Sequence, residues 1–235
     1  MPQYDYLIFD ADHTLIDFDR DEKRAFRAAF GAADVACTED MIEDCWRFSA
    51  KNWADLGLLN VHLPELRARY HDLYHEHVRG IADYMERTFP LGQRSAAAAQ
   101  VFSEALALAA HPMDGAVEVL DALAPRYNLC VATNGLSDMQ AGRLSLLRSY
   151  FDRVFVSEEM GCIKPDTAFF RQMLAELGTS PDKCLMIGDS LSSDITGANA
   201  VGMACVWFNR RAEALPDGVK VRAVIRDLRE LLAML

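Results

Sequence analysis

Several features are missing from this 235-residue sequence, and each absence excludes a class of protein. No apolar run approaches the length of about 20 residues that a helix needs to span a bilayer. An excess of basic residues is also missing. The formal net charge is −11, which argues against nucleic-acid polymers and anionic membranes as partners. We therefore expect a partner that is neither a nucleic acid nor a membrane.

The cysteines show no Cys-x-x-Cys pair. Cys130, Cys184 and Cys205 lie within apolar runs, where a free thiol behaves as a small core residue. The first apolar run begins at Tyr6, which leaves no room for a signal peptide before it. These features predict reduced thiols and a cytoplasmic protein.

The first apolar run leads directly into two carboxylates. Tyr6 to Phe9 has the character of a buried strand, and Asp10 and Asp12 follow it. Because unpaired carboxylates are costly to bury, two at the end of a buried strand need compensation. A bound Mg2+ would supply it, since hard cations prefer oxygen ligands. The alternative is a strand that ends in an ordinary polar turn.

Residues 18–109 have helical character throughout, with no strong strand signal. We expect helices over 21–30 with Gly31 as the stop, from Thr38 onward, over 63–79 and over 95–110. This stretch is predicted to form an all-helical cap inserted after the first strand. The α/β catalytic core would then comprise residues 1–17 and 110–235.

The rest of the chain alternates between strand and helix patterns. Expected strands cover 129–133, 154–156, 184–187, 203–208 and 224–225. Expected helices cover 116–123, 137–147, 166–177, 194–200 and 228–235. The alternation predicts an α/β fold with right-handed crossovers, a Rossmann-like three-layer core around a parallel sheet. Ligands of such sheets bind at the carboxyl ends of the strands.

Polar groups follow several of these strands at their carboxyl ends. Thr133-Asn134-Gly135 follows one strand and Gly188-Asp189-Ser190 another, with Asp194 close behind. Lys164, held in a loop before Pro165, is a point charge suited to phosphate. Alone, each feature is typical of a turn, a helix cap or a solvated loop. Together they predict a site for a hard cation and an anion.

This set of residues resembles the motifs of the haloacid dehalogenase superfamily of phosphatases. The four motifs are Asp10-Ala11-Asp12-His13-Thr14, Thr133-Asn134-Gly135, Lys164-Pro165 and Gly188-Asp189-Ser190-Leu191-Ser192-Ser193-Asp194. The predicted helical insert is similar to the four-helix cap of that family. The resemblance implies Mg2+ as cofactor and a small phosphorylated metabolite as substrate.

The resemblance also implies a role for each residue. Asp10 would be the nucleophile that forms an aspartyl-phosphate, and Asp12 would protonate the leaving oxygen and then activate water. Thr133 and Lys164 would hold the phosphoryl group, together with Asn134 and Gly135.

Mg2+ would bind Asp10, Asp189 and the main-chain carbonyl of Asp12, according to the same resemblance. Asp194 and Ser190 would support these ligands. Catalysis would then consist mostly of positioning and charge stabilisation.

Asp12 separates the branches of the family. The dehalogenases lack this second carboxylate because a halide needs no proton, so Asp12 favours phosphoryl transfer over carbon–halogen cleavage. A hexose-phosphate mutase keeps both aspartates and remains an alternative, although we find no cap loop typical of mutases. A phosphate-binding protein without chemistry is disfavoured, since binding alone does not require Asp12.

Within the phosphatases, several stretches are similar to the house-cleaning pyrimidine 5′-nucleotidases. They are residues 9–15, 132–135, 156–161, 164–165 and 207–211. The similarity implies a pyrimidine nucleoside 5′-monophosphate as substrate. Phosphoglycolate-type and broad sugar-phosphate hydrolysis are the alternatives. Chain length and charge are compatible with a monomer or a small homo-oligomer.

Two residues are candidates for substrate selection. His13 either faces the leaving group or caps its own loop, and loop capping is the favoured interpretation. Trp53 can stack on a base, although packing within the cap is favoured. His71, His75 and His77 share one expected helix; without an evident third metal ligand, we expect them to form a solvated face.

Overall fold

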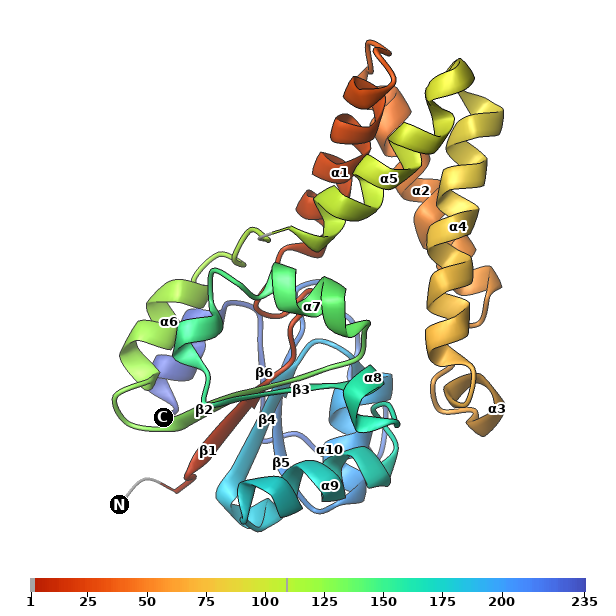
Figure 1. Ribbon diagram of the computed structural model, residues 1–235. Helices are drawn as coiled ribbons and strands as arrows, with labels where there is room; N and C mark the ends of the chain where they lie inside the picture. The colour runs from red at the N-terminus through yellow and green to blue at the C-terminus, as the bar shows by residue number, and fades with distance from the viewer. Residues whose placement is uncertain (1–2, 109) are drawn as a thin grey trace.

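The computed structural model describes residues 3–108 and 110–235. A bundle of helices extends from an α/β part, and both ends of the described chain lie in the α/β part (Figure 1). Residue 109, the expected last residue of the cap, lies outside the described residues. The exact domain boundaries therefore stay a prediction.

A parallel sheet with the order β3-β2-β1-β4-β5-β6 forms the centre of the α/β part. Its strands are β1 (Tyr6–Phe9), β2 (Asn128–Thr133), β3 (Arg153–Val156), β4 (Cys184–Gly188), β5 (Ala204–Phe208) and β6 (Ala223–Ile225). In the middle of the sheet, Leu7 of β1 lies opposite Leu129 of β2 and Leu185 of β4. The expected α/β fold with a parallel sheet is confirmed.

Both faces of the sheet are buried, which explains the continuous apolar runs of its strands. Successive side chains of a strand point to opposite faces. Leu7 and Phe9 thus pack into one apolar cluster with α6 (Ala116–Leu123), whereas Ile8 packs into another with α9 (Thr167–Leu177). The helices on the two sides form the outer layers of a three-layer core (Figure 1).

The remaining core helices are short. They are α7 (Ser137–Arg143), α8 (Ser157–Met160) and α10 (Thr196–Ala200). The helix expected over 137–147 thus ends early, and the one expected over 194–200 begins in a π-helical turn, Leu191–Ile195. Where a helix is expected over 228–235, a capping box of Asp227 and Glu230 opens a 3-10 helix, Leu228–Ala233.

The helical part contains α1 (Phe18–Ala32), α2 (Glu39–Asp55), α3 (Pro64–Arg67), α4 (Tyr70–Thr88) and α5 (Ser95–Ala107). Thr38 caps α2 as expected, with its side chain accepting a hydrogen bond from Met41 N. Two expectations were wrong. Gly31 lies inside α1 and does not end it, and the single helix expected over 63–79 is divided between α3 and α4.

Apolar faces of these helices form a separate core. Phe26 of α1 stacks on Phe102 of α5 with ring centroids 4.9 Å apart. This cluster continues into the α/β part through Leu136, Met139 and Ile163. A polar contact also joins the two parts, since His71 Nε2 of α4 lies 2.9 Å from Ser157 Oγ of α8. The cap therefore packs against the edge of the sheet where the strands end.

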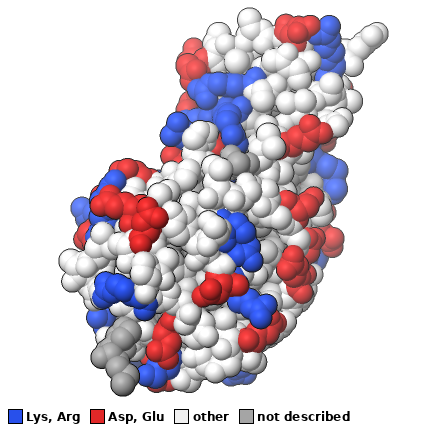
Figure 2. All heavy atoms as spheres, turned by 60° about the vertical axis from the view of Figure 1, so that its left-hand side comes forward, with Lys and Arg blue, Asp and Glu red and all other residues white. Residues whose placement is uncertain are grey.

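The surface carries charges of both signs (Figure 2), and the cysteines are unpaired. Basic and acidic side chains are interspersed on the face shown in Figure 2. All six cysteines are free thiols. Within residues 3–108 and 110–235, none of the helices has both the length and the apolar character required to cross a membrane.

Candidate active site

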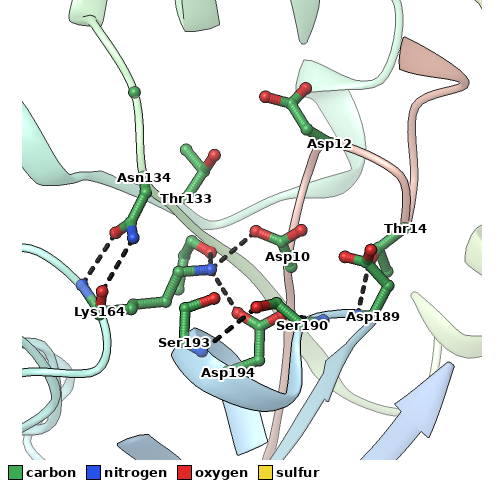
Figure 3. A network of polar contacts seen from close by, with 12 residues as sticks. Asp10, Asp12, Thr14, Thr133, Asn134, Lys164, Asp189, Ser190, Ser193 and Asp194 are labelled. Carbon is green, nitrogen blue, oxygen red and sulfur yellow. Dashed lines mark hydrogen bonds and ion pairs between the residues drawn. The ribbon is translucent and has the colours of Figure 1, made fainter. Parts of the chain in front are cut away.

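The structure brings most of the residues predicted from the sequence together at the carboxyl edge of the sheet. Asp10 follows β1, Thr133 ends β2, and Asp189 follows β4. Lys164 reaches the same point from the loop after α8, and Asp194 reaches it from the π-helical turn after β4 (Figure 3). Parallel strands place their carboxyl ends at one edge, so residues far apart in sequence meet there.

Lys164 is the centre of this group. Its Nζ donates hydrogen bonds to Asp10 Oδ1 at 2.7 Å, to Asp194 Oδ1 at 2.6 Å and to the carbonyl of Ala132 at 2.6 Å. The side chain is buried, and its two carboxylate neighbours raise the pKa of Lys164 above its usual value although burial opposes this. Lys164 therefore carries a fixed positive charge beside the predicted nucleophile.

Asn134 positions the loop that carries Lys164. Its side-chain amide donates to the Lys164 carbonyl at 2.9 Å and accepts from the Lys164 N–H at 2.8 Å. Gly135 N donates to Ser157 Oγ at 3.0 Å. Both groups thus make contacts within the protein, whereas Thr133, Asn134 and Lys164 also line the cavity described below.

Three carboxylates surround the lysine. Oxygen atoms of Asp10, Asp189 and Asp194 all lie within 4.8 Å of one another. Burial raises the pKa of Asp10 well above its usual value, and the neighbouring Asp194 and Asp189 add to this effect while Lys164 opposes it. Burial, followed by the charge of Asp194, raises the pKa of Asp189 to about 7. One lysine does not balance these three carboxylates, of which Asp10 and Asp194 are buried and Asp189 is partly exposed, so the donor set fits a hard divalent cation.

Local geometry holds these carboxylates in place. Ser190 N donates to Asp194 Oδ2 at 3.1 Å, and Thr14 Oγ1 accepts from Asp189 N at 3.1 Å. Gly188 leaves room for Asp194, because a Cβ at position 188 would lie 2.2 Å from Asp194 Oδ2. The glycine before Asp189 is therefore required by a close approach.

The Asp12 carboxylate points away from that of Asp10 (Figure 3). Its Oδ2 accepts from Gln140 Nε2 at 2.9 Å and from Arg143 Nη1 at 3.2 Å, and Arg143 Nη2 forms an ion pair with Oδ1 at 2.6 Å. Sequence reasoning missed both partners, which lie on α7. Their spacing of three residues on the helix that follows Thr133 is the signal that could have indicated them.

A single cavity of about 730 Å3 connects this edge of the sheet with the cap. Asp10, Asp12 and Lys164 line one side of it. The cap wall combines aromatic and polar side chains: Trp46, Trp53, Tyr70, Tyr74, Glu22, Ser49 and His77. Its size lies within the usual range of small-ligand pockets, roughly 300–1,000 Å3.

The two candidate selecting residues both line this cavity. His13 has a left-handed backbone, with φ of 64°, and its Nδ1 lies 3.3 Å from Arg210 Nη2. Burial lowers the pKa of His13. Trp53 packs edge-on against Tyr74 and also faces the cavity, so core packing and cavity lining occur together.

The expectation that the three cap histidines form a solvated face was wrong for two of them. His75 is exposed, but His77 is only 5% exposed and lines the cavity. His71 is half-buried and contacts Ser157. His77 lies on the face of α4 that also carries the buried Leu73 and Ile81, and this spacing of four residues could have indicated its burial.

Comparisons with known proteins point in one direction. The family model described as haloacid dehalogenase-like hydrolase matches residues 4–202. The pyrimidine 5′-nucleotidase PynA of Streptococcus pneumoniae is 35% identical over 214 residues, which cover 88% of this chain and 84% of PynA. The pyrimidine 5′-nucleotidase YjjG of Escherichia coli is 30% identical over 233 residues, which cover 97% and 96% of the two chains.

The solved structures agree on the fold. The HAD-hydrolase YfnB of Bacillus subtilis, solved with magnesium bound, superimposes with a TM-score of 0.77 at 26% identity over 99% of both chains. A dehalogenase structure gives a TM-score of 0.78 at 18% identity, covering 100% of this chain and 98% of that one. At that identity the second likeness concerns the fold alone.

Proposed function

The chain belongs to the haloacid dehalogenase-like hydrolases and is a phosphatase of that family, and we propose that it hydrolyses pyrimidine nucleoside 5′-monophosphates with Mg2+ as cofactor. The observation that carries the proposal is the position of Lys164, which joins Asp10 to Asp194 at the floor of the large cavity. A buried nucleophile beside a fixed positive charge is suited to attack on a phosphoryl group.

In the proposed reaction an oxygen of Asp10 attacks phosphorus, and the bond from phosphorus to the ester oxygen breaks. Asp12 gives its proton to that leaving oxygen. Water then attacks the phosphorus of the aspartyl-phosphate and transfers a proton to Asp12. The bond from phosphorus to the Asp10 oxygen breaks, so phosphate is released and Asp10 is restored. Lys164 and Thr133 hold the phosphoryl oxygens through both steps.

Asp12 must move for this role. Its carboxylate is engaged by Gln140 and Arg143, so in this conformation it does not reach toward Asp10. Rotation about its side-chain bonds would free it. We therefore infer that Asp12 leaves Arg143 when substrate binds.

Asp10, Asp189 and the main-chain carbonyl of Asp12 are the groups proposed to hold Mg2+, with Asp194 and Ser190 in support. When bound, the ion would neutralise charge on the phosphoryl group during transfer. The three clustered carboxylates support this assignment.

An anionic substrate needs local positive charge in a chain of net charge −11. Arg210 and Arg211, from the loop after β5, line the cavity together with Lys164. These groups support binding of a small phosphorylated metabolite. A cytoplasmic location and a monomer or small homo-oligomer complete the proposal, as do the domain boundaries 1–17, 18–109 and 110–235.

The test is phosphate release from nucleoside monophosphates, sugar phosphates and phosphoglycolate, with Mg2+, with EDTA and with Asp10→Asn. We expect Mg2+-dependent release that favours UMP or TMP and falls by about 10⁴-fold or more in the variant. Equal release from many substrates would leave a phosphatase and refute the pyrimidine preference. Turnover by Asp10→Asn at the unaltered rate would refute the nucleophile.

A further inference from the structure

Three helices of the cap bring buried polar side chains to the wall of the cavity opposite Asp10. They are Glu22 of α1, Ser49 of α2 and His77 of α4, each less than 6% exposed. Ser49 Oγ donates to Glu22 Oε1 at 2.5 Å and lies 3.4 Å from His77 Nε2. The phosphoryl-transfer steps above use none of these residues.

The hydrogen bonds of this cluster have one direction. Asn52 Nδ2 lies 3.0 Å from His77 Nδ1, and an amide nitrogen can only donate. His77 Nδ1 is therefore the acceptor, and the ring proton belongs on Nε2, which faces Ser49. Burial lowers the pKa of His77 to about 4, so the ring is neutral at pH 7. Asn52 thus donates to His77, His77 donates to Ser49, and Ser49 donates to the carboxyl group of Glu22.

Flat aromatic side chains flank the cluster. The Trp53 ring lies edge-on to His77, with centroids 5.0 Å apart, and Trp46 and Tyr74 line the same wall. Lys23 Nζ lies 4.4 Å from the ring centroid of Trp46. A wall of this kind offers apolar surfaces to a planar ring and a hydrogen-bonding group to its edge.

We propose that Glu22, ordered by Ser49 and His77, binds the N3–H of a uracil or thymine base while the phosphate lies at Asp10 and Lys164. This assignment rests on the proposed nucleotidase function and identifies Glu22 as the residue that selects the base. An ionised carboxylate accepts the imide N–H of uracil and thymine. Cytosine presents an unprotonated ring nitrogen at the same position and would face the carboxylate lone pairs.

The ionisation of Glu22 sets the pH of the experiment. Burial raises its pKa to about 7, against the opposing effects of Ser49, Arg143 and Lys23, while Asp19 adds to the rise. At pH 8 the carboxylate therefore predominates. Binding is measured there, so that uracil meets the acceptor form.

The first measurement uses uridine, which lacks the phosphate, as the probe. Trp46, Trp53 and Trp207 all line the cavity, so their fluorescence reports its occupation. We expect saturable binding of uridine, weaker binding of cytidine and none of ribose. Glu22→Gln should weaken uridine binding roughly 10-fold, because the acceptor loses its charge. Ser49→Ala should weaken it by a smaller factor.

The matched control is Glu65→Gln, the same change at an exposed glutamate of the cap. It should bind uridine as the unmodified chain does. Absence of uridine binding, or unchanged binding by Glu22→Gln, would overturn the assignment. Circular dichroism of each variant verifies that the cap is folded.

Turnover separates this inference from the proposed function. With UMP, Glu22→Gln should lower kcat/KM about 10-fold, and with ribose 5-phosphate it should change kcat/KM less than about 3-fold. If UMP is hydrolysed and Glu22→Gln affects both substrates equally, the nucleotidase stands and the base site is refuted. If ribose 5-phosphate is hydrolysed and UMP is not, both are refuted.

Discussion

The two walls of the cavity differ in how they treat charge. At the sheet edge, Lys164 forms ion pairs with the carboxylates of Asp10 and Asp194. On the cap wall, by contrast, His77 is neutral and Glu22 hydrogen-bonds to a hydroxyl. The difference indicates a division of labour, because transfer of a phosphoryl group needs fixed charge whereas recognition of a neutral ring needs directional hydrogen bonds.

Arg143 stands between the two walls. It is fully buried, forms the ion pair with Asp12 and also lowers the pKa of Glu22 through its charge. Changes at the sheet edge should therefore affect all substrates alike, and changes on the cap wall should affect nucleotides alone. Changes at Arg143 should affect all substrates to some extent and nucleotides more than the others.

The largest effect is expected for Lys164→Met. The change leaves Asp10 and Asp194 buried without their cation, which should destabilise the protein by about 3–5 kcal/mol and lower kcat about 10³-fold for every substrate. Urea denaturation and phosphate release measure the two effects. The control is Lys183→Met, at an exposed lysine of the α/β part, which should change neither the stability nor kcat. A loss confined to nucleotides would contradict the division of labour.

Glu22 gives the second effect, in stability rather than rate. Its pKa is about 7 in the folded protein and 4.5 without the environment of the fold. The folded protein thus holds the proton more tightly, so this contribution favours folding at low pH and is lost as the pH rises through 7. The two values imply a loss of roughly 3 kcal/mol between pH 4.5 and pH 8.

Glu22→Gln should remove that slope. Urea denaturation in EDTA at several pH values, for the variant and the unmodified chain, gives the difference directly. The variant should gain stability relative to the unmodified chain as the pH rises. If the difference in free energy of unfolding between the two chains stays constant across the pH range, the pKa of Glu22 is not raised by the fold.

The smallest effect is expected for Arg143→Leu, which frees Asp12 from its ion pair. Because Asp12 is proposed to leave Arg143 during the reaction, we expect kcat to fall only about 10-fold, well below the full contribution of a general acid. The kcat values of UMP and ribose 5-phosphate should both fall, and the KM of UMP should rise as well. An effect on KM alone would place Arg143 with the cap wall.

Much of the sheet edge could be predicted from the sequence. Asp10 and Asp189 directly follow strand ends, and a parallel sheet brings such ends together whatever the details of packing. The start of the helix capped by Thr38 was also predicted, since a cap depends on neighbours a few residues away.

The cap wall could not be predicted in the same way. Glu22, Ser49 and His77 come from three different helices, and no local pattern marks any of them as polar groups facing a cavity. The single helix expected over 63–79 shows the same limit, because its division into α3 and α4 depends on packing that periodicity does not encode. Trp53 likewise required the structure to show that one ring both packs and lines the cavity.

By itself the sequence determined the strands, their polar ends and the residues proposed for phosphoryl transfer, because these follow from local patterns and from one rule of parallel sheets. Tertiary structure decided the conformation of Asp12, held by Arg143, and the composition of the cap wall. The physical reason is that helix rotation and crossing set which side chains meet, and both are fixed by the packing of the whole cap.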